Sequence, residues 1–446
     1  MKILLLHQYF LEEDDPGGSR WNEMAKSWTD EGNEVTVIAG MMHYNGDEKR
    51  KVYKKKYFSN HNQGNIRVIR THVSESYNNG FLGRLNGYIS FMISSILAGI
   101  FKVSGKFDAI VVTSPPLFIG ISGYLISRIK RAPMVFEVRD LWPESAIDTG
   151  ILTNKWIIKL AYKVEAFLYK KSTLINVLTP AFRTKLIEKG VPKEKIIFIP
   201  NAADFNLAEK LAKDFDPIQF KKDLGFENNM VITYVGAHGV ANHLIQVLDA
   251  AEKLTNTNVI FQLIGSGMQK KALMMEAVSR NITNVVFRDP VPKSEVFKYI
   301  LASDMGASIL KKVDTFKTVY SNKTFDYFSC KKPVLMAIGG ISAELIKEAD
   351  AGTYVEPENA LEYNRVIRDY IADPERLNRE GENGFNFAKK DFDRIVLAEK
   401  FIKQIKLALS IKDIPKKDEV LKYNRQKDYS VKGISVQRAK EKITTE

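Results

Sequence analysis

Short apolar segments alternate with longer amphipathic segments along most of the chain. A short apolar run is typical of a strand buried on both faces, and such strands form parallel sheets covered by helices. The sequence therefore predicts an α/β protein with two series of strands. The first series is expected at 3–6, 35–38, 66–69, 109–112, 134–138, 174–177 and 196–199. The second series is expected at 231–235, 259–264, 285–287, 305–309, 333–337 and 353–355.

A chain of 446 residues exceeds what one hydrophobic core usually organises, so the two series predict two doubly wound domains. The boundary is placed at the turn-forming run 199–204, Ile-Pro-Asn-Ala-Ala-Asp, which follows the last strand of the first series. We therefore predict one domain over residues 1–200, a second over residues 201–386, and a basic tail over residues 411–446.

The formal net charge of +13 is concentrated in the first half of the chain, with basic runs at 49–51 and 54–56. Such a positive field attracts nucleic acid, anionic lipid or phosphorylated substrates without distinguishing them. The longest uncharged stretch, 85–101, is shorter than the ~20 apolar residues of a membrane span and contains several serines and glycines. We expect it to form a buried or interfacial helix.

Metal and disulfide chemistry is not indicated by the sequence. The single cysteine, Cys330, excludes an intrachain disulfide, and its aromatic neighbours predict a core thiol. His238 and His243 have no adjacent third ligand, so no zinc site is expected. Asp391 and Asp393 form a D-x-D pattern, but they open the last expected helix, where acids suit the helix dipole. We expect no metal and no cofactor.

Three loops that follow predicted strands contain glycine. They are 16–20 (Pro-Gly-Gly-Ser-Arg), 236–239 (Gly-Ala-His-Gly) and 265–267 (Gly-Ser-Gly). Glycine allows the backbone to approach an anion closely, and the amides at a helix N-terminus then bind it. The loops do not match GxGxxG, and no acid ends a second strand where a dinucleotide ribose would require one. The pattern therefore favours phosphate binding and disfavours a dehydrogenase.

The segment 319–335 contains a lysine and an aspartate within an aromatic helix. Ser321 or Asn322 is expected to cap this helix, and residue 333 is a proline that opens the next strand. Lys323 and Asp326 are three residues apart, which places both on one face. From the residues alone, they are either a surface ion pair or part of a binding site.

The ordered motifs resemble the GT4 family of retaining glycosyltransferases over about residues 1–410. Within that family the chain looks most like bacterial O-antigen and capsule transferases of the N-acetylfucosaminyl type. The motifs are the Gly17-Gly18 loop, Glu-Val-Arg-Asp-Leu-Trp-Pro-Glu at 137–144, Ile-Pro-Asn at 199–201, Tyr-Val-Gly at 234–236, Leu-Ile-Gly-Ser-Gly at 263–267, Asn-Lys-Thr-Phe-Asp-Tyr at 322–327 and Lys-Pro-Val at 332–334.

The resemblance implies the GT-B fold, in which two Rossmann-like domains face a cleft. Residues 1–200 would form the acceptor-side domain and residues 201–386 the nucleotide-sugar-binding domain. A helix at about 387–410 would cross back to the first domain.

The resemblance also implies roles for individual residues. Asp326 matches the second acid of the family's E-x7-E motif and would bind the donor ribose, while Thr318 replaces the first acid, next to the donor sugar. Asp140 and Glu144 would orient the acceptor; their alternative is a helix cap with a salt bridge to Arg139. The remaining residues expected to bind the donor are Gly17, Gly18, Gly236, His238, Gly239, Gly265, Asn322 and Lys323.

The implied reaction moves an N-acetylated amino or deoxyamino sugar from a UDP-linked donor to an undecaprenyl-diphosphate-linked glycan. The protein would work in the cytoplasm, peripherally bound at the inner face of the membrane, without metal and without nucleic acid. The alternative is a nucleic-acid-binding or scaffold protein that uses the basic first half. That alternative is weakened because the basic residues are not part of a known recognition motif.

Overall fold

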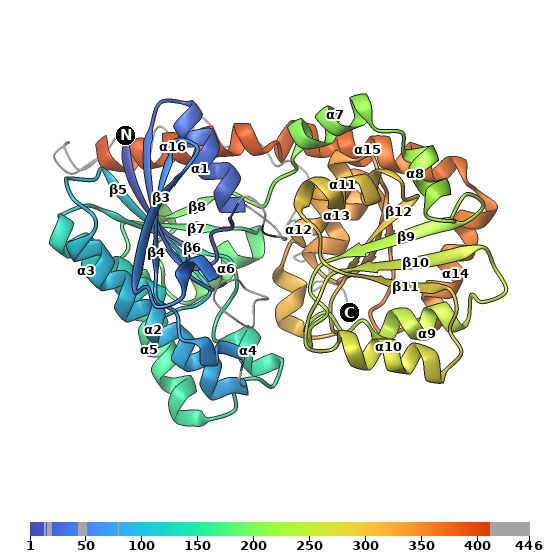
Figure 1. Cartoon of the computed structure of the whole chain (residues 1–446), viewed down its shortest axis with the longest axis horizontal. Helices are drawn as coiled ribbons and strands as arrows, with labels where there is room; N and C mark the ends of the chain where they lie inside the picture. Colours follow the sequence, from blue (N-terminus) through green and yellow to red (C-terminus); the bar gives the residue numbers. More distant parts are fainter. Residues whose placement is uncertain (13–14, 16–19, 43–50, 79, 411–446) are drawn as a thin grey trace, which may run out of the picture.

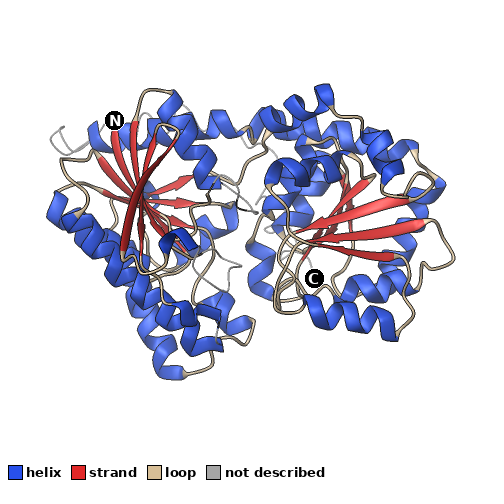
Figure 2. Ribbon diagram, in the orientation of Figure 1, coloured by secondary structure: helices blue, strands red, loops and turns tan. Residues whose placement is uncertain are grey.

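The computed structural model describes the chain except residues 13–14, 16–19, 43–50, 79 and 411–446. It contains two α/β domains, each with a central sheet covered by helices (Figure 1, Figure 2). Gly17, Gly18 and the predicted basic tail lie outside the described residues.

The first sheet has eight strands, and all neighbours are parallel except β3, which is antiparallel to β4. Every strand predicted in this half overlaps an observed one. The prediction missed β3, an edge strand with the polar sequence FSNHNQ. The strand contains only one apolar side chain, so it lacks the alternation of apolar and polar residues that identifies a strand in a sequence. In spatial order the strands are β3 (Phe58–Gln63), β4 (Ile66–Thr71), β2 (Glu34–Gly40), β1 (Lys2–Leu6), β5 (Ala109–Ser114), β6 (Met134–Val138), β7 (Leu174–Val177) and β8 (Ile196–Phe198).

The second sheet has six parallel strands, and each overlaps a predicted segment. In spatial order they are β11 (Val285–Arg288), β10 (Val259–Ile264), β9 (Met230–Val235), β12 (Met305–Ile309), β13 (Val334–Ala337) and β14 (Gly352–Tyr354). Numbered within the domain this order is 3-2-1-4-5-6, which is the Rossmann order. The predicted fold class, with two Rossmann-like domains, is therefore confirmed.

Helices cover both faces of each sheet. In the first domain they are α1 (Arg20–Asp30), α2 (Gly80–Phe101), α3 (Ile119–Lys130), α4 (Glu144–Asp148), α5 (Lys155–Lys171) and α6 (Pro180–Glu188), with 3-10 turns η1 (Lys51–Tyr53), η2 (Glu75–Asn78) and η3 (Lys193–Lys195). In the second they are α7 (Phe205–Asp214), α8 (Pro217–Asp223), α9 (Ile245–Glu252), α10 (Lys270–Ser279), α11 (Lys293–Leu301), α12 (Asn322–Ser329), α13 (Ile341–Ala349), α14 (Ala360–Ala372) and α15 (Glu375–Asp391), with η4 (Asp314–Thr318).

The predicted helix at about 387–410 is two helices rather than one. Helix α15 ends at Asp391, and α16 (Arg394–Ser410) begins after a break at Phe392 and Asp393. At this break Ala203 of the interdomain linker donates its backbone N–H to the Phe392 carbonyl over 2.9 Å. The Asp393 carboxylate accepts from the Ile395 amide over 3.0 Å, so this acid acts as the expected cap.

Helix α16 packs against α1 of the first domain. The indole N–H of Trp28 donates to the Ala398 carbonyl over 3.0 Å, and the Phe401 ring lies 5.6 Å from the Trp28 ring and 5.9 Å from Trp21. These aromatic contacts fasten the last helix to the first domain. Figure 1 shows α16 lying beside α1.

Candidate active site

The second domain places its candidate residues at the carboxyl ends of two neighbouring strands. Strands β9 and β12 lie side by side, although β10 and β11 come between them in the sequence. Loop 236–244 follows β9, and the segment that leads to α12 follows β12. The Lys311 amide donates to the Ala241 carbonyl over 2.8 Å, which joins the two loops. This is the switch point at which open parallel sheets bind ligands.

The two glycine loops of this domain pack backbone against backbone. A Cβ at Gly265 would lie 1.9 Å from the carbonyl oxygen of Gly236, and both residues have positive φ, +148° and +144°. A Cβ at Gly236 would lie 3.3 Å from Cε of Lys323. Glycine is therefore required at these positions by close approach and by backbone conformation. The structure thus brings Gly236, Gly265 and Lys323 together.

Lys323 and Asp326 lie on α12 as predicted, but they do not form an ion pair. The Lys323 amine lies over the ring of Tyr234, 4.9 Å from its centroid, and burial lowers the pKa of Lys323 to about 8. Burial raises the pKa of Asp326 to about 6, and the buried Oδ1 atom of Asp326 has no hydrogen-bond partner among the described residues. The surface ion-pair interpretation is therefore wrong.

The predicted side-chain cap of α12 is also not observed. Ser321 occupies the N-cap position, but no side-chain hydrogen bond caps the helix, and the buried Oδ1 of Asn322 is likewise unpartnered in the described structure. The Thr324 amide donates to the Ser321 carbonyl over 3.2 Å, and the two amides before it in α12 keep their capacity to bind an anion. Burying unsatisfied polar atoms costs free energy. Such atoms are common in ligand sites, where the ligand becomes their partner.

A cluster of charges lies close to Asp326. Lys293, the first residue of α11, pairs with Asp204 over 2.6 Å and also pairs with Glu23 of α1. Arg394 of α16 pairs with the same Glu23. The positive charges of Lys293 and Arg394 act on the Asp326 carboxylate and oppose the effect of burial on its pKa. This cluster was not predicted, because its members are far apart in the chain.

Thr318 is held by a hydrogen bond within the protein, whereas His238 is held by packing against aromatic rings. The Thr318 hydroxyl donates to the Thr315 carbonyl over 2.6 Å, so it is not oriented towards a donor sugar in this state. The His238 side chain is fully buried beside Tyr234 and Phe287, and burial lowers its pKa to about 4, which keeps the ring neutral. Both His238 ring nitrogens lack partners in the described part of the chain. Gly239 lies in the same loop, near Asn242.

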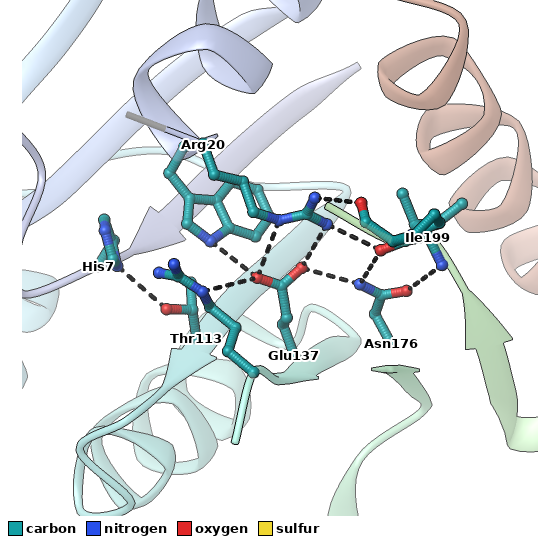
Figure 3. Close-up of polar contacts among 9 residues, drawn as sticks. His7, Arg20, Thr113, Glu137, Asn176 and Ile199 are labelled. Carbon is teal, nitrogen blue, oxygen red and sulfur yellow. Dashed lines mark hydrogen bonds and ion pairs between the residues drawn. The ribbon is translucent and has the colours of Figure 1, made fainter. Parts of the chain in front are cut away.

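In the first domain, a buried glutamate organises the sheet edge that faces the second domain (Figure 3). The fully buried Glu137 carboxylate accepts from Arg20 over 3.0 Å, from the Trp21 indole over 3.0 Å and from Asn176 over 2.8 Å. Arg20 also donates to the carbonyls of Ile199 and Pro200. The network therefore ties the start of α1 to the interdomain linker.

This network was not predicted, although the sequence held a signal for it. Glu137 is the only charged residue in an otherwise apolar strand, and a buried carboxylate requires a partner. Nearby, Nδ1 of His7 lies 3.0 Å from the Thr113 hydroxyl, and burial holds the pKa of His7 well below its usual value.

Asp140 and Glu144 follow β6 and have different environments. Asp140 accepts from the Ser145 hydroxyl over 2.8 Å, and burial raises its pKa. Glu144 pairs with Lys189 over 2.6 Å. Neither Asp140 nor Glu144 forms a salt bridge with Arg139, so the salt bridge that was the alternative role for these two acids is wrong. The carboxylate nearest to Arg139 is Glu137, at 3.9 Å.

Contacts across the domain interface bring the candidate residues of the first domain towards those of the second domain. Asp148 of α4 accepts a hydrogen bond from Thr315 of η4, and the Thr179 hydroxyl donates to the Thr318 carbonyl over 2.8 Å. The segment that carries Asp140 and Glu144 therefore lies beside the segment that carries Thr318. Among the residues that the structure describes, no group of three or more His, Cys, Asp or Glu side chains is placed to hold a metal ion.

Comparison with known proteins yields two matching families, one in each domain. Residues 17–202 match the family described as "Glycosyl transferase 4-like domain", and residues 216–387 match "Glycosyl transferases group 1". The two matches together span most of both domains and meet near the linker.

Two curated proteins and one solved structure illustrate the similarity. The "Putative colanic acid biosynthesis glycosyl transferase WcaI" of Escherichia coli (strain K12) is 25% identical over 424 residues, which cover 91% of this chain and all of the relative. The "Alpha-galactosylglucosyldiacylglycerol synthase" of Streptococcus pneumoniae (strain ATCC BAA-255 / R6) is 23% identical over 54% of this chain and 63% of its own. Anabaena Alr3699/HepE, solved in complex with UDP-glucose, is 19% identical, with a TM-score of 0.65 over 91% of this chain and 99% of its own.

Proposed function

The chain belongs to the GT4 family of GT-B glycosyltransferases, and from this premise we propose that it transfers a sugar from a UDP-linked donor to a lipid-linked glycan. The donor sugar in this proposal is an N-acetylated amino or deoxyamino sugar. The acceptor is an undecaprenyl-diphosphate-linked glycan in the synthesis of a bacterial surface polysaccharide. The name of the colanic acid relative and the UDP-glucose bound to a structural neighbour support the pathway class and the nucleotide.

The observation that carries the proposal is the state of α12. Its Lys323 side chain lies beside Gly236, which packs against Gly265, and the same helix carries the N-terminal amides and a buried Asp326 oxygen without a partner in the described structure. A carboxylate accepts two hydroxyl donors at once, which suits the 2′- and 3′-hydroxyls of a ribose. An amine and helix amides suit a diphosphate. The arrangement thus offers separate partners for the two polar parts of a nucleoside diphosphate.

The same groups provide a mechanism for the sugar transfer. The bond between the sugar C1 and the UDP oxygen breaks, and negative charge develops on the departing diphosphate, where Lys323 and the α12 amides stabilise it. The acceptor hydroxyl attacks C1 from the same face, and its proton passes to the departing phosphate oxygen. In this proposal Asp140 and Glu144 orient the acceptor, and the configuration at C1 is retained.

The remaining donor contacts are proposed by position. His238 and Gly239 belong to the loop after β9, Asn322 begins α12, and Thr318 ends η4. Thr318 would contact the sugar only after its hydroxyl leaves the Thr315 carbonyl. Gly17 and Gly18 stay in the proposal as donor-binding residues and lie outside the described residues. No metal is assigned to the reaction, because cationic and N–H groups of the chain are available to the diphosphate.

Ligand-dependent melting tests the proposal. A nucleotide that binds only the folded protein stabilises it by about 2.7 kcal/mol at a hundred times its dissociation constant. UDP and UDP-sugars should raise the melting temperature of the wild-type protein, GDP should not, and Asp326→Ala should lose the response. Stabilisation by oligonucleotides but not by any nucleotide would instead support the nucleic-acid-binding alternative. Release of UDP from a panel of UDP-sugars in the presence of acceptor would then identify the donor.

The lipid-linked acceptor sets the proposed location. We place the enzyme in the cytoplasm, peripherally bound at the inner face of the membrane, where such acceptors are exposed. Lys54, Lys55 and Lys56 are exposed, as a membrane-facing basic run requires, but residues 49 and 50 lie outside the described structure.

A further inference from the structure

Helix α2 exposes large apolar side chains and buries polar ones. By length and composition alone its segment Gly83–Phe101 is apolar enough to cross a membrane, yet Phe91 and Ala98 on its inner side are packed in the core of the first domain. The inner side also carries Ser94 and Ser95, both fully buried, whereas Ile93 is 47% exposed. A helix at the surface of a soluble domain normally turns its polar side chains outwards.

Small residues on the inner side allow α2 and α3 to pack closely. The Ser95 hydroxyl donates to the Ser122 hydroxyl of α3 over 2.9 Å, and a Cβ at Gly99 would overlap the Ile126 side chain. With serine and glycine used between the helices, the larger apolar side chains are left on the outside. The exposed apolar surface is therefore a consequence of how the helices pack.

The apolar surface continues over α3 and α5, which lie with α2 on the same side of the first sheet (Figure 1). The Tyr124 ring of α3 contacts the Phe167 ring of α5 at 4.9 Å and joins the two helices. At the start of α5, Trp156 is 81% exposed and Leu160 is 56% exposed. We call the outer side of α2, α3 and α5 the three-helix face. Its exposed apolar side chains are Ile89, Ile93, Phe101, Leu125, Ile129, Trp156, Leu160, Tyr162 and Phe167.

The charge on the three-helix face has one sign. The three helices contain a single acid, Glu165, which is buried and accepts hydrogen bonds from Lys189 over 2.6 Å and Tyr169 over 2.8 Å. Its charge is therefore neutralised inside the domain. The exposed basic residues of the helices are Arg128, Lys155, Lys159, Lys163, Lys170 and Lys171.

The exposed apolar side chains and the positive charge of the three-helix face together decide between possible partners. A second copy of the chain would bring the same positive charge against itself, and like charges in contact oppose association. Nucleic acid would match the charge but offers nothing to bury aliphatic side chains such as Ile93 and Leu160. An anionic bilayer satisfies both, since the apolar side chains enter the interface while lysines reach the lipid phosphates and a tryptophan lies between them.

We propose that the three-helix face docks the enzyme on an anionic lipid bilayer, with the start of α5 as its main point of insertion. The proposal names the membrane-binding surface of the proposed function and rests on it. Helix α5 is also connected to the acceptor-side segment, because Lys189 bridges Glu165 of α5 to Glu144 of α4 with 2.6 Å contacts to both. A bilayer on this face would therefore hold a lipid-linked acceptor next to the residues proposed to orient it.

Vesicle co-sedimentation of the full-length protein tests the surface. The probes are vesicles of phosphatidylcholine alone and vesicles that also contain phosphatidylglycerol, each at low and at high salt. The wild type should bind the anionic vesicles, and salt should weaken but not abolish binding, because the apolar contacts are not screened. Reversing the charge of three lysines, Lys155→Glu with Lys159→Glu and Lys163→Glu, should weaken binding by about tenfold or more.

A matched pair of double variants separates this face from general surface hydrophobicity. Trp156→Glu with Leu160→Glu should also weaken vesicle binding by about tenfold. Ile218→Glu with Leu361→Glu removes two apolar side chains of the second domain that are 79% and 71% exposed, and should leave it unchanged. All four side chains are exposed, so both variants should melt like the wild type. Equal effects of the two double variants, or no effect of either, would overturn the proposal.

Two further readouts distinguish the remaining outcomes. If the wild type sediments as a dimer, the Trp156 and Leu160 variant is a monomer and vesicle binding is unchanged, the face is a subunit interface and the proposal is wrong. The UDP-dependent shift in melting temperature, measured on the same samples, reports the proposed function separately. A protein that responds to UDP but binds no vesicle contradicts only the docking surface, and one that binds vesicles without responding to UDP contradicts only the glycosyl transfer.

Discussion

Apart from the antiparallel edge strand β3 and the additional strand β8 of the first sheet, the two sheets have the same strand order, but the domains use the polar groups at their sheet edges differently. In the first domain, the Glu137 carboxylate has three close donors, and Arg20 joins it to the carbonyls of the linker. In the second, buried polar atoms of Asn322, Asp326 and His238 have no partner among the described residues. The comparison teaches that the Glu137 carboxylate is used to hold the chain together, whereas the unpartnered oxygens of Asn322 and Asp326 are left available to a ligand.

The largest expected effect follows from breaking the first-domain network. Removing one partner of a buried ion pair leaves an uncompensated charge, so Glu137→Ala should lower the free energy of unfolding by about 3–5 kcal/mol. Chemical denaturation measures this loss. Glu34, which forms an exposed pair with Lys2 in the same domain, is the control, because an exposed pair is worth only about 0–1 kcal/mol. Similar losses for Glu137→Ala and Glu34→Ala would mean that the network does not support the fold.

The corresponding acid of the second domain should behave in the opposite way. Asp326→Asn should weaken UDP-sugar binding by more than tenfold, since a charge-assisted hydrogen bond is worth about 1.5–3 kcal/mol. Calorimetric titration gives the affinity, and the fold should remain intact. Unchanged affinity would remove Asp326 from the donor site and leave the two domains without a functional contrast.

Two glycines of the second domain, Gly265 and Gly225, test whether the contact between the glycine loops shapes the donor site. Gly265→Ala and Gly225→Ala both place a Cβ at positive φ, which costs about 1–3 kcal/mol of stability. Only at Gly265 would the Cβ meet another loop, at the Gly236 carbonyl, whereas Gly225 has open space around it. Gly265→Ala should therefore also reduce UDP-sugar affinity, and Gly225→Ala should not. Equal affinity in both variants would show that the contact between the loops does not shape the site.

The ionisation of Asp326 should affect how the stability of the protein depends on pH. Burial raises the pKa of this carboxyl from 3.8 to about 6, so the folded protein binds more protons than the unfolded chain between these values. The ionised side chain therefore destabilises the fold above about pH 6, and this cost is relieved as the pH falls through that window. Asp326→Asn should melt at a higher temperature than the wild type at pH 8, and the difference should disappear near pH 4. A constant difference at every pH would contradict this account.

The smallest expected effect is that of chelation. The proposed diphosphate site uses Lys323 and helix amides, so EDTA should leave the transfer rate largely unaltered. Complete inhibition by EDTA that Mg²⁺ reverses would instead support a metal site at Asp391 and Asp393.

Local patterns in the sequence were sufficient for much of the fold. Apolar runs predicted the strands because a strand buried on both faces requires them, and i, i+3 spacing placed Lys323 and Asp326 on one face of α12. The same reasoning missed β3, whose sequence is polar, and joined α15 to α16, because the break at Phe392 depends on a backbone contact with Ala203.

The sequence by itself determined which elements form and which residue types lie at the ends of the strands. Only the tertiary structure decided how these residues are used. Lys293, Glu23 and Arg394 come from α11, α1 and α16, and only the arrangement of these three helices in the folded structure brings them into contact. Likewise, the outward apolar side of α2 exists because Ser95 and Gly99 are used in packing on α3. Periodicity depends on neighbours in the chain, whereas charge pairing and exposure depend on neighbours in space.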